Sequence, residues 1–245
     1  MQGFASNTYT EVLEGYIGKR HARRAESIDS NVHFFLPHHG VFHPQKPNKL
    51  RAVFDCAAKF HSRSLNDELL SGPDLMNNLV GVLFRFRMGK FAFACDIESL
   101  FHQICMPIYD QRFLWRPKGD VSLKPEVCCM TVHLFGAKSS PSCANFALLQ
   151  TAEDNSNEFD DLPIGTARRN FYMDDCLKAV HSVKATRLVK QLSKLLEQRG
   201  FRLGKWFEHL RWACYGKNTH SVGGADWREE WSNDYAFVLE ATELR

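Results

Sequence analysis

Two adjacent carboxylates, Asp174 and Asp175, stand between two apolar segments and constrain the fold more than any other feature of the sequence. An aromatic pair, Phe171 and Tyr172, precedes them. The apolar residues after them are Cys176, Leu177, Ala179 and Val180. This pattern predicts two short strands joined by a turn that holds the acidic pair. Neighbouring carboxylates repel and are costly to bury without a counter-ion, so the pair indicates a cation-binding turn or, alternatively, an exposed turn.

A third carboxylate, Asp96, ends a segment of small and apolar residues that begins at Phe91. Strand alternation would place Ala92, Ala94 and Asp96 on one face and Phe91, Phe93 and Cys95 on the other. Small residues leading to a carboxylate are typical of the floor of a site. The alternative is that Asp96 caps a following helix. The apolar stripe of that predicted helix, which would end at Pro107, is Ile97, Leu100, Phe101 and Ile104.

Basic residues precede these carboxylates in a strand predicted over residues 49–55. Leu50, Ala52 and Phe54 would point one way and Arg51, Val53 and Asp55 the other. Arg51, together with Lys49 and Lys46, could present positive charge to a triphosphate. The alternative is an edge strand whose Lys and Arg side chains discourage aggregation.

Three carboxylates brought together from two strands would hold two divalent cations about 3.5–4 Å apart. One ion lowers the pKa of an attacking hydroxyl, and the other neutralises a leaving pyrophosphate. Oxygen ligands favour Mg²⁺ or Mn²⁺ over zinc. The sequence contains no P-loop, so a nucleotide would be held by the metal ions and by scattered cations.

Periodicity predicts further elements around these motifs. Helices are predicted over residues 75–86, from 140–141 through 149, and over 188–196 before Gly200. Strands are predicted over residues 111–116, 126–133 and 201–206. The basic residues at 19–24 favour a solvated helix face, with contact to a phosphate backbone as the alternative.

Four histidines, His33, His38, His39 and His43, lie close together in the sequence. Their spacing fits no standard zinc site, and no cysteine is near. We interpret residues 32–36 as a strand and residues 37–40 as its turn, with a zinc-binding module as the alternative.

Composition excludes few classes of protein. The 245 residues suffice for one large or two small domains, and 44% hydrophobic and 24% charged residues are ordinary for a globular protein. A net charge of +3 neither requires nor excludes nucleic acid. No apolar segment approaches the roughly 20 residues that span a bilayer, and residues 1–10 do not resemble a signal peptide. The eight cysteines form no CxxC pair, which favours reduced thiols in an intracellular protein.

The order of these motifs resembles the fingers and palm of reverse transcriptases. The strings that carry the resemblance are LRAVFD, ACDIESLF, LFGAKSSP, FYMDD and GFRLGKW. The flanking strings FFLPHHGVFHP, SLNDELLSGPDL, LFRFRMGKFAFACDIESLFHQI and RFLWRP are similar, more specifically, to Bel/Pao-type long-terminal-repeat retrotransposons. The resemblance extends from about Tyr9 to Trp206.

The resemblance implies roles for the residues that match the motifs. Asp96, Asp174 and Asp175 would ligate two Mg²⁺ or Mn²⁺ ions, with the backbone carbonyl of Ile97 completing a site. Phe101, five residues after Asp96, would block a ribose 2′-hydroxyl and so select deoxynucleotides.

The same resemblance assigns the nucleotide pocket and the primer terminus. Arg51 would contact the triphosphate, assisted by Lys46 or Lys49, and Lys205 would protonate the pyrophosphate. The residues implied for the pocket wall are Phe135 and Gly136, and those implied near the primer terminus are Tyr172 and Met173.

The implied fold is α+β: a right-hand polymerase whose small antiparallel sheet is backed by helices, with the thumb largely missing. The expected order is a partly helical N-terminal extension (1–30), fingers (31–90), palm (91–107), fingers and palm strands (108–140), palm (141–209) and an unmatched tail (210–245). Phe207, Glu208 and His209 replace the usual residues after the Lys-Trp pair, and no primer-grip hairpin, ribonuclease H, protease or integrase follows. The sequence therefore resembles a fragment of a polyprotein.

The implied reaction is the addition of deoxynucleotides to a primer 3′-hydroxyl, directed by an RNA or DNA template. The implied setting is an intracellular, cytoplasmic retroelement particle without a membrane, and the oligomeric state is not implied. One alternative is an inactive or co-opted remnant that binds nucleic acid or protein without polymerising. Another is a different metal-dependent phosphoryl-transfer enzyme, such as a cyclase built on a related palm.

Overall fold

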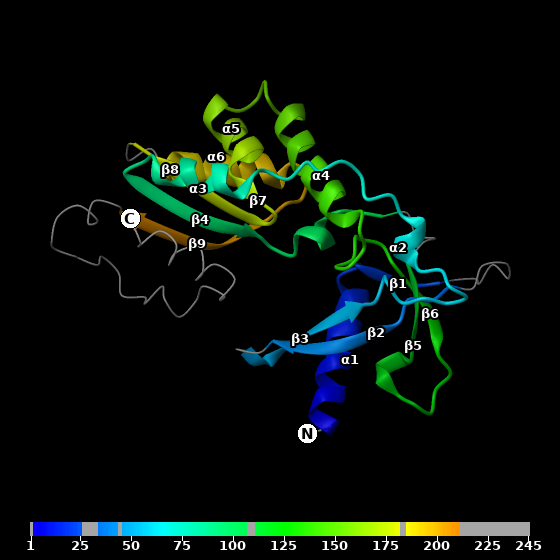
Figure 1. The fold of residues 1–245 in the computed structure, drawn as a ribbon. Helices are drawn as coiled ribbons and strands as arrows, with labels where there is room; N and C mark the ends of the chain where they lie inside the picture. Colours follow the sequence, from blue (N-terminus) through cyan, green and yellow to red (C-terminus); the bar gives the residue numbers. More distant parts are fainter. Residues whose placement is uncertain (1, 26–33, 44–45, 107–110, 182–184, 211–245) are drawn as a thin grey trace. The chain divides into compact units, whose positions relative to one another are not determined.

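The computed structural model describes residues 2–25, 34–43, 46–106, 111–181 and 185–210 (Figure 1). Its contacts divide the chain into two units, residues 1–209 and residues 210–245. Apart from Leu210, the second unit, which coincides with the predicted tail, lies outside the described residues. The predicted α+β class is confirmed, because helices and small antiparallel sheets make up the first unit.

The largest sheet has four strands, β7 (Phe171–Tyr172), β8 (Asp175–Val180), β4 (Phe91–Ile97) and β9 (Leu203–Leu210), in that spatial order. Strand β8 runs antiparallel to both β7 and β4. The predicted hairpin around the acidic pair and the predicted strand that ends near Asp96 are therefore confirmed. The sheet joins strands whose residues are far apart in the sequence.

Three helices pack against this sheet and share a hydrophobic core with it (Figure 1). They are α4 (Ser140–Asp154), α5 (Asp161–Arg169) and α6 (Ala185–Glu197). The helix predicted over residues 188–196 is confirmed, and it extends over residues 185–197. Its leucines are at most 1% exposed, and they are Leu188, Leu192, Leu195 and Leu196. Each buried leucine contributes about 1.5–3 kcal/mol of transfer free energy, so α6 is held mainly by this stripe.

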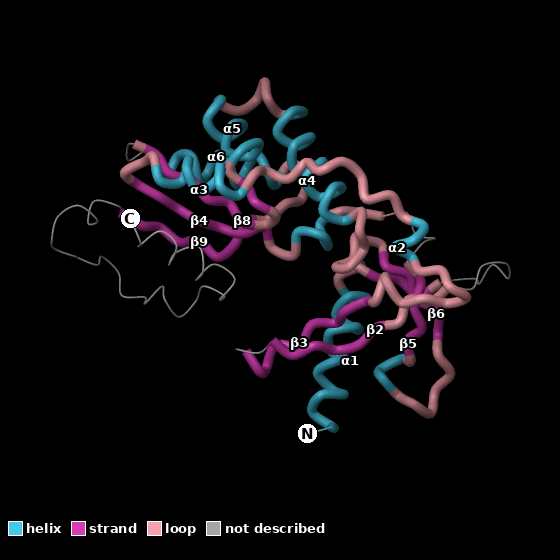
Figure 2. Tube along the Cα trace, in the orientation of Figure 1, coloured by secondary structure: helices cyan, strands magenta, loops and turns pink. Residues whose placement is uncertain are grey.

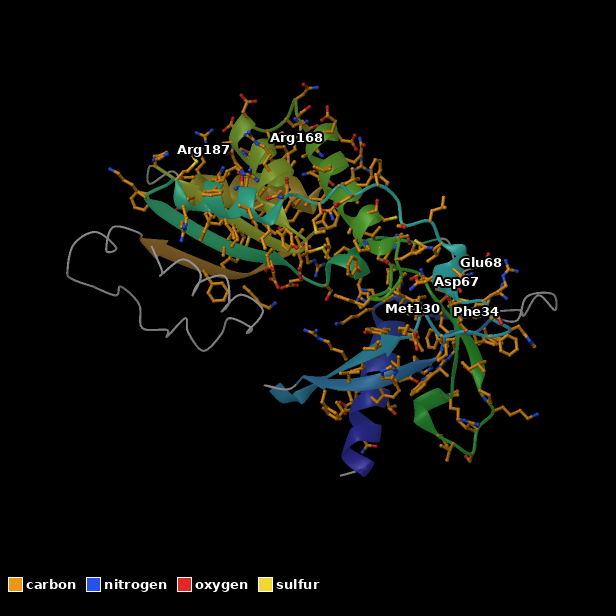
Figure 3. All side chains as sticks on the ribbon, in the orientation of Figure 1. Phe34, Asp67, Glu68, Met130, Arg168 and Arg187 are labelled. Carbon is orange, nitrogen blue, oxygen red and sulfur yellow. The ribbon has the colours of Figure 1, made fainter. Side chains whose placement is uncertain are left out.

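Ion pairs join these helices on their outer side. Arg168 pairs with Glu153, and Arg187 Nη2 lies 2.9 Å from Asp160 Oδ2. Figure 3 labels both arginines at the surface. Exposed pairs of this kind contribute little to stability, so the buried apolar residues fix the arrangement.

A second, three-stranded sheet has the order β1 (Ala22–Arg24), β6 (Glu126–Met130), β5 (Arg112–Trp115), with antiparallel pairs. Strands β5 and β6 confirm the strands predicted over residues 111–116 and 126–133, with shorter bounds. Strand β1 was not predicted, and the expectation that residues 19–24 form a helix face is wrong. The reason is that residues 22–24 pair with residues 128–130 of β6 and bury Ala22, which is 2% exposed.

Helix α1 (Gln2–Gly18) and a hairpin share a second hydrophobic core with this sheet (Figure 2). The hairpin consists of β2 (His38–His43) and β3 (Lys46–Phe54). The predicted turn over residues 37–40 is wrong, because His38 lies inside β2. Its Nε2 is 2.9 Å from Leu114 O and its Nδ1 is hydrogen-bonded to the Tyr9 hydroxyl. The strand therefore begins at His38, inside the predicted turn, and residues 34–36 of the predicted strand lie outside it.

Short helices connect these parts: α2 (Leu65–Glu68), α3 (Leu79–Arg87), and the 3-10 turns η1 (Leu100–Gln103) and η2 (Pro117–Gly119). Helix α3 begins four residues later than predicted, because the Asn78 side chain caps it by accepting from Gly81 N–H at 3.1 Å. The predicted helix after Asp96 shrinks to η1. No helix among the described residues is long and apolar enough to cross a membrane.

Candidate active site

The carboxylates of Asp96 and Asp175 lie on neighbouring strands in register. Asp96 pairs with Asp175 across β4 and β8. The N–H of Ile97 donates to Asp174 O at 2.8 Å, which makes residues 96 and 175 a non-hydrogen-bonded pair. Side chains of such pairs are the closest in an antiparallel sheet, with Cβ atoms about 4.5–5.5 Å apart. The predicted convergence of distant carboxylates is therefore built into the strand register.

The turn between β7 and β8 brings Asp174 within electrostatic reach of Asp96. Met173 adopts a left-handed conformation with φ of 54°, which lets Tyr172 pair directly with Asp175. Burial raises the pKa of the Asp174 carboxyl, and the charge of Asp96 raises it further. The backbone hydrogen bond of Asp174 and the charges of Lys205 and Arg51 lower this pKa without reversing the shift.

Asp96 is the most enclosed of the three carboxylates. Its side chain is 11% exposed, and Oδ2 accepts a hydrogen bond from Lys205 Nζ. Its second oxygen, Oδ1, is buried without a hydrogen-bond partner. The alternative that Asp96 caps a helix is wrong, because it lies within β4 and Ser99 precedes η1.

Gly204 allows β9 to approach these carboxylates. A Cβ atom at this position would lie 2.8 Å from Glu98 Oε1 and 3.3 Å from Asp96 Oδ1. The residue that follows, Lys205, has a φ of 44° and reaches back to Asp96. The sequence string GFRLGKW therefore has a steric basis in the structure.

These carboxylates suit a divalent cation by their chemistry. All the donors are oxygen atoms, which Mg²⁺ and Mn²⁺ prefer. The unpartnered Asp96 Oδ1 and the mutual repulsion of Asp96 and Asp174 are features that a cation would relieve. In the described part of the chain, no three His, Cys, Asp or Glu side chains are close enough to form a metal site. Lys205 instead supplies the positive charge at Asp96.

The residues expected to line a nucleotide pocket also meet. Phe101 is 5% exposed and packs edge-to-face on Phe135, with ring centroids 4.7 Å apart. Gly136 has a φ of 96°, and Asn66 fixes its loop by donating from Nδ2 to Gly136 O at 2.9 Å and accepting from Lys138 N–H at 2.9 Å. Sequence reasoning missed Asn66, since an asparagine in a short helix carries no distinctive pattern.

The expected basic residues come from strand β3. Leu50 and Phe54 are buried and Arg51 is exposed, which confirms the predicted alternation. The charge of Arg51 acts on Asp174, so β3 brings a cation within electrostatic reach of the carboxylates. Lys46 and Lys49 lie in the same strand, but their side chains lie outside the described residues.

Of the residues expected near a primer, Tyr172 is half-buried and Met173 packs against the core. The histidine cluster does not form a metal centre in the described residues, because the His38 ring is occupied by Tyr9 and Leu114. His33 lies outside the described residues, as does the side chain of His43.

Comparison with solved structures identifies a fold. The foamy viral protease-reverse transcriptase bound to double-stranded DNA matches with a TM-score of 0.57 and 17% identity, over 82% of this chain and 30% of that chain. The native protease-reverse transcriptase of prototype foamy virus matches with a TM-score of 0.56 and 18% identity, over 81% and 23%. A foamy viral protease-reverse transcriptase in complex with an RNA/DNA hybrid matches with a TM-score of 0.57 and 17% identity, over 81% of this chain and 23% of that chain. This chain has a reverse transcriptase-like fold.

The likeness is one of fold, since no family model and no curated protein matches the sequence. This chain spans between 23% and 30% of the length of these three viral chains.

Proposed function

We propose that this chain is the fingers-and-palm part of an RNA-directed DNA polymerase of the Bel/Pao type, and a fragment of a longer polyprotein. Its substrates are deoxynucleoside triphosphates and a primer on an RNA or DNA template. The fingers are residues 31–90, the palm residues 91–107 and 141–209, and residues 108–140 contribute strands to both. Its setting is a cytoplasmic retroelement particle.

The observation that carries this proposal is the pairing of Asp96 with Asp175, next to the hydrogen bond from Ile97 N–H to Asp174 O. In two-metal phosphoryl transfer, carboxylates carried by strands β4 and β8 and by the turn before β8 would supply oxygen ligands to the ions. The viral proteins with this fold are named as reverse transcriptases, and two were solved with nucleic acid bound. Both facts support the same reaction.

In this proposal Asp96, Asp174, Asp175 and the carbonyl of Ile97 hold two divalent ions. When bound, these ions lower the pKa of the primer 3′-hydroxyl and neutralise the leaving pyrophosphate. The Lys205 ammonium, which contacts Asp96 in the structure, moves to the pyrophosphate and donates its proton there.

Other residues bind and orient the nucleotide. Arg51 binds the triphosphate, with Lys46 or Lys49 beside it. Phe101 excludes a 2′-hydroxyl, and it is itself held by Phe135 in the loop that Gly136 shapes. Tyr172 and Met173 lie beside the primer terminus in this proposal.

Primer extension on an RNA template, with Mg²⁺ or Mn²⁺, tests the function. The parent chain is expected to extend the primer, and Asp174→Asn is expected to abolish extension because it removes a metal-binding charge without changing shape. Asp161→Asn is the matched control, since it makes the same change at an exposed position in α5 and should extend normally.

Each outcome has a distinct meaning. Extension by Asp174→Asn at the parent's rate would refute the two-metal assignment. Failure of a folded parent to extend any primer would refute the polymerase function for this chain.

A second candidate is an inactive or co-opted remnant that binds nucleic acid without polymerising. It is favoured by the ion pair of Lys205 with Asp96, because this pair occupies a carboxylate that a metal ion would need. A gel-shift assay with primer-template distinguishes it, because a remnant would bind the duplex while the extension assay stays negative.

A further inference from the structure

The turn that carries Phe101 is short, and a hydrogen bond from Gln103 Nε2 to Glu98 O at 2.8 Å ties it to the residue after β4. This turn, η1, is one turn of 3-10 helix. The residue before it, Ser99, has a left-handed conformation with φ of 50°. Inside it, His102 N–H donates to Ser99 O at 2.7 Å and Ile104 N–H donates to Phe101 O at 3.3 Å. Short 3-10 turns have poor hydrogen-bond geometry. The position of Phe101 therefore depends on what packs against this turn.

The residue after Phe101 packs against the N-terminal segment. The ring of His102 lies with its centroid 5.1 Å from that of Tyr16, edge-to-face at 72°, and 5.1 Å from that of His21 at 41°. Tyr16 and His21 are themselves 6.2 Å apart. We call Tyr16, His21 and His102 the ring cluster. Edge-to-face and tilted aromatic pairs are favourable and directional, so the cluster fixes the orientation of His102.

The end of α1 is shaped to deliver the two N-terminal rings. His21 N–H donates to Tyr16 O at 2.8 Å and Arg20 N–H donates to Ile17 O at 3.0 Å, while Arg20 is left-handed with φ of 60°. This is the Schellman arrangement, which commonly brings the residue after the helix back onto its last turn. Here that contact is between His21 and Tyr16.

Backbone hydrogen bonds tie the same segment to the far side of the turn. Thr131 N–H donates to His21 O at 2.8 Å, and Met106 N–H donates to Thr131 O at 2.8 Å. His133 N–H then donates to Ile104 O at 3.0 Å. The N-terminal segment, residues 131–133 and the residues after η1 are therefore held as one ladder.

The ring cluster also joins the two hydrophobic cores. Phe101 belongs to the core beneath the four-stranded sheet, and Tyr16 packs against the core beside the three-stranded sheet. Burial and the charges of His21 and Lys19 lower the pKa of His102 to about 4. At neutral pH His102 is therefore an uncharged aromatic ring that fills space between the cores.

We propose that His102, held between Tyr16 and His21, positions Phe101 and so sets how strictly the site rejects a nucleotide with a 2′-hydroxyl. The inference rests on the proposed polymerase function. His102 is a positioning residue in it, since its ring contacts the N-terminal segment while Phe101 meets the sugar. Displacements of about 1 Å are enough to change the rate with a bound substrate strongly. Loss of the His102 ring removes its contacts with Tyr16 and His21, so the turn that carries Phe101 can shift.

The test is single-nucleotide incorporation of a deoxynucleotide and of the matching ribonucleotide, with kcat and KM measured for each. His102→Ala is expected to lower the preference for the deoxynucleotide by on the order of tenfold, mostly through a lower KM for the ribonucleotide. His102→Phe is expected to keep the preference, because a ring remains in the same place. Tyr16→Leu, which keeps an apolar side chain but removes the ring edge on His102, is expected to lower it as His102→Ala does.

Glu14→Gln is the matched control on the same helix. Glu14 Oε1 accepts from Trp115 Nε1 at 2.8 Å and from Lys118 N–H at 3.0 Å. The glutamine oxygen can still accept both bonds but carries no charge, so the variant weakens them without touching the ring cluster. It is expected to keep the parent's sugar preference. Thermal unfolding of every variant shows which of them fold.

The outcomes separate this inference from the function on which it rests. A parent that discriminates, with unchanged preference in both His102→Ala and Tyr16→Leu, would overturn the positioning role and leave the polymerase function standing. Equal loss of preference in Glu14→Gln would also overturn it, because general loosening of α1 would then suffice. A folded parent that neither incorporates nor binds nucleotides would refute the function, and the inference with it.

Discussion

Acidification should destabilise this protein through His102, and the size of the effect follows from its surroundings. In the unfolded chain a histidine has its ordinary pKa of 6.5, and burial beside His21 and Lys19 lowers the pKa of His102 to about 4. Between these two values the unfolded state binds the additional proton and the folded state does not. The free energy of unfolding therefore falls as the pH falls from 6.5 toward 4.

The magnitude comes from the difference between the two pKa values. The loss from His102 alone is about 2 kcal/mol by about pH 5 and about 3 kcal/mol by about pH 4, relative to neutral pH. His21 has a pKa lowered in the same direction, and the raised pKa of Asp174 acts in the opposite direction. A comparison with His102→Phe isolates His102, since the other groups are present in both proteins.

Urea unfolding of the parent and of His102→Phe at several pH values measures this difference. The two unfolding free energies should change together above about pH 7 and separate by about 2 kcal/mol at about pH 5, with the parent losing more. Curves that stay parallel down to about pH 5 would show that the His102 ring is not buried in its neutral form. That result would refute the packing from which the ring cluster was inferred.

Three further changes have defined expected results. Arg20→Gly should raise the free energy of unfolding by up to about 1 kcal/mol in urea titration, because it relieves a left-handed conformation at the end of α1; a loss of stability would contradict this. Asn170→Ala should cost roughly 1–3 kcal/mol in thermal unfolding, since the side chain, in a residue 2% exposed, donates to Leu177 O at 2.9 Å; an unchanged melting temperature would count against that bond. Mg²⁺ should raise the melting temperature of the parent but not of Asp96→Asn, and equal shifts would remove Asp96 from metal binding.

Elements with a local pattern could be predicted from the sequence. The hairpin around Asp174 needs only the apolar segments on either side of the acidic pair, and α6 needs only its leucine stripe. Strand β4 alternates small and large residues up to Asp96. These three elements contain or support the candidate site, so the amino-acid sequence alone is enough to locate its carboxylates.

Elements decided by distant contacts could not be predicted. His38 begins a strand, where it pairs with Phe54 and its ring is hydrogen-bonded to Tyr9 and Leu114, and none of these partners is near it in the sequence. Residues 22–24 form a strand because β6 is there to pair with them. Local propensity in both cases favoured another conformation, and the tertiary contact decided. His102 stayed unnoticed for the same reason, since its neighbours Tyr16 and His21 lie far upstream.

The register between β4 and β8 has a consequence for the integrity of the chain. Asp96 and Asp175 face each other across two strands, yet everything from Ile97 to Asp174 lies between them in the sequence, including the exposed turn at Val121 and Leu123. A single peptide-bond cleavage anywhere in that interval leaves the carboxylates on separate polypeptides. Only the strand pairing and the shared core would then hold the two pieces together. A cleaved molecule therefore keeps its site only while these non-covalent contacts remain formed.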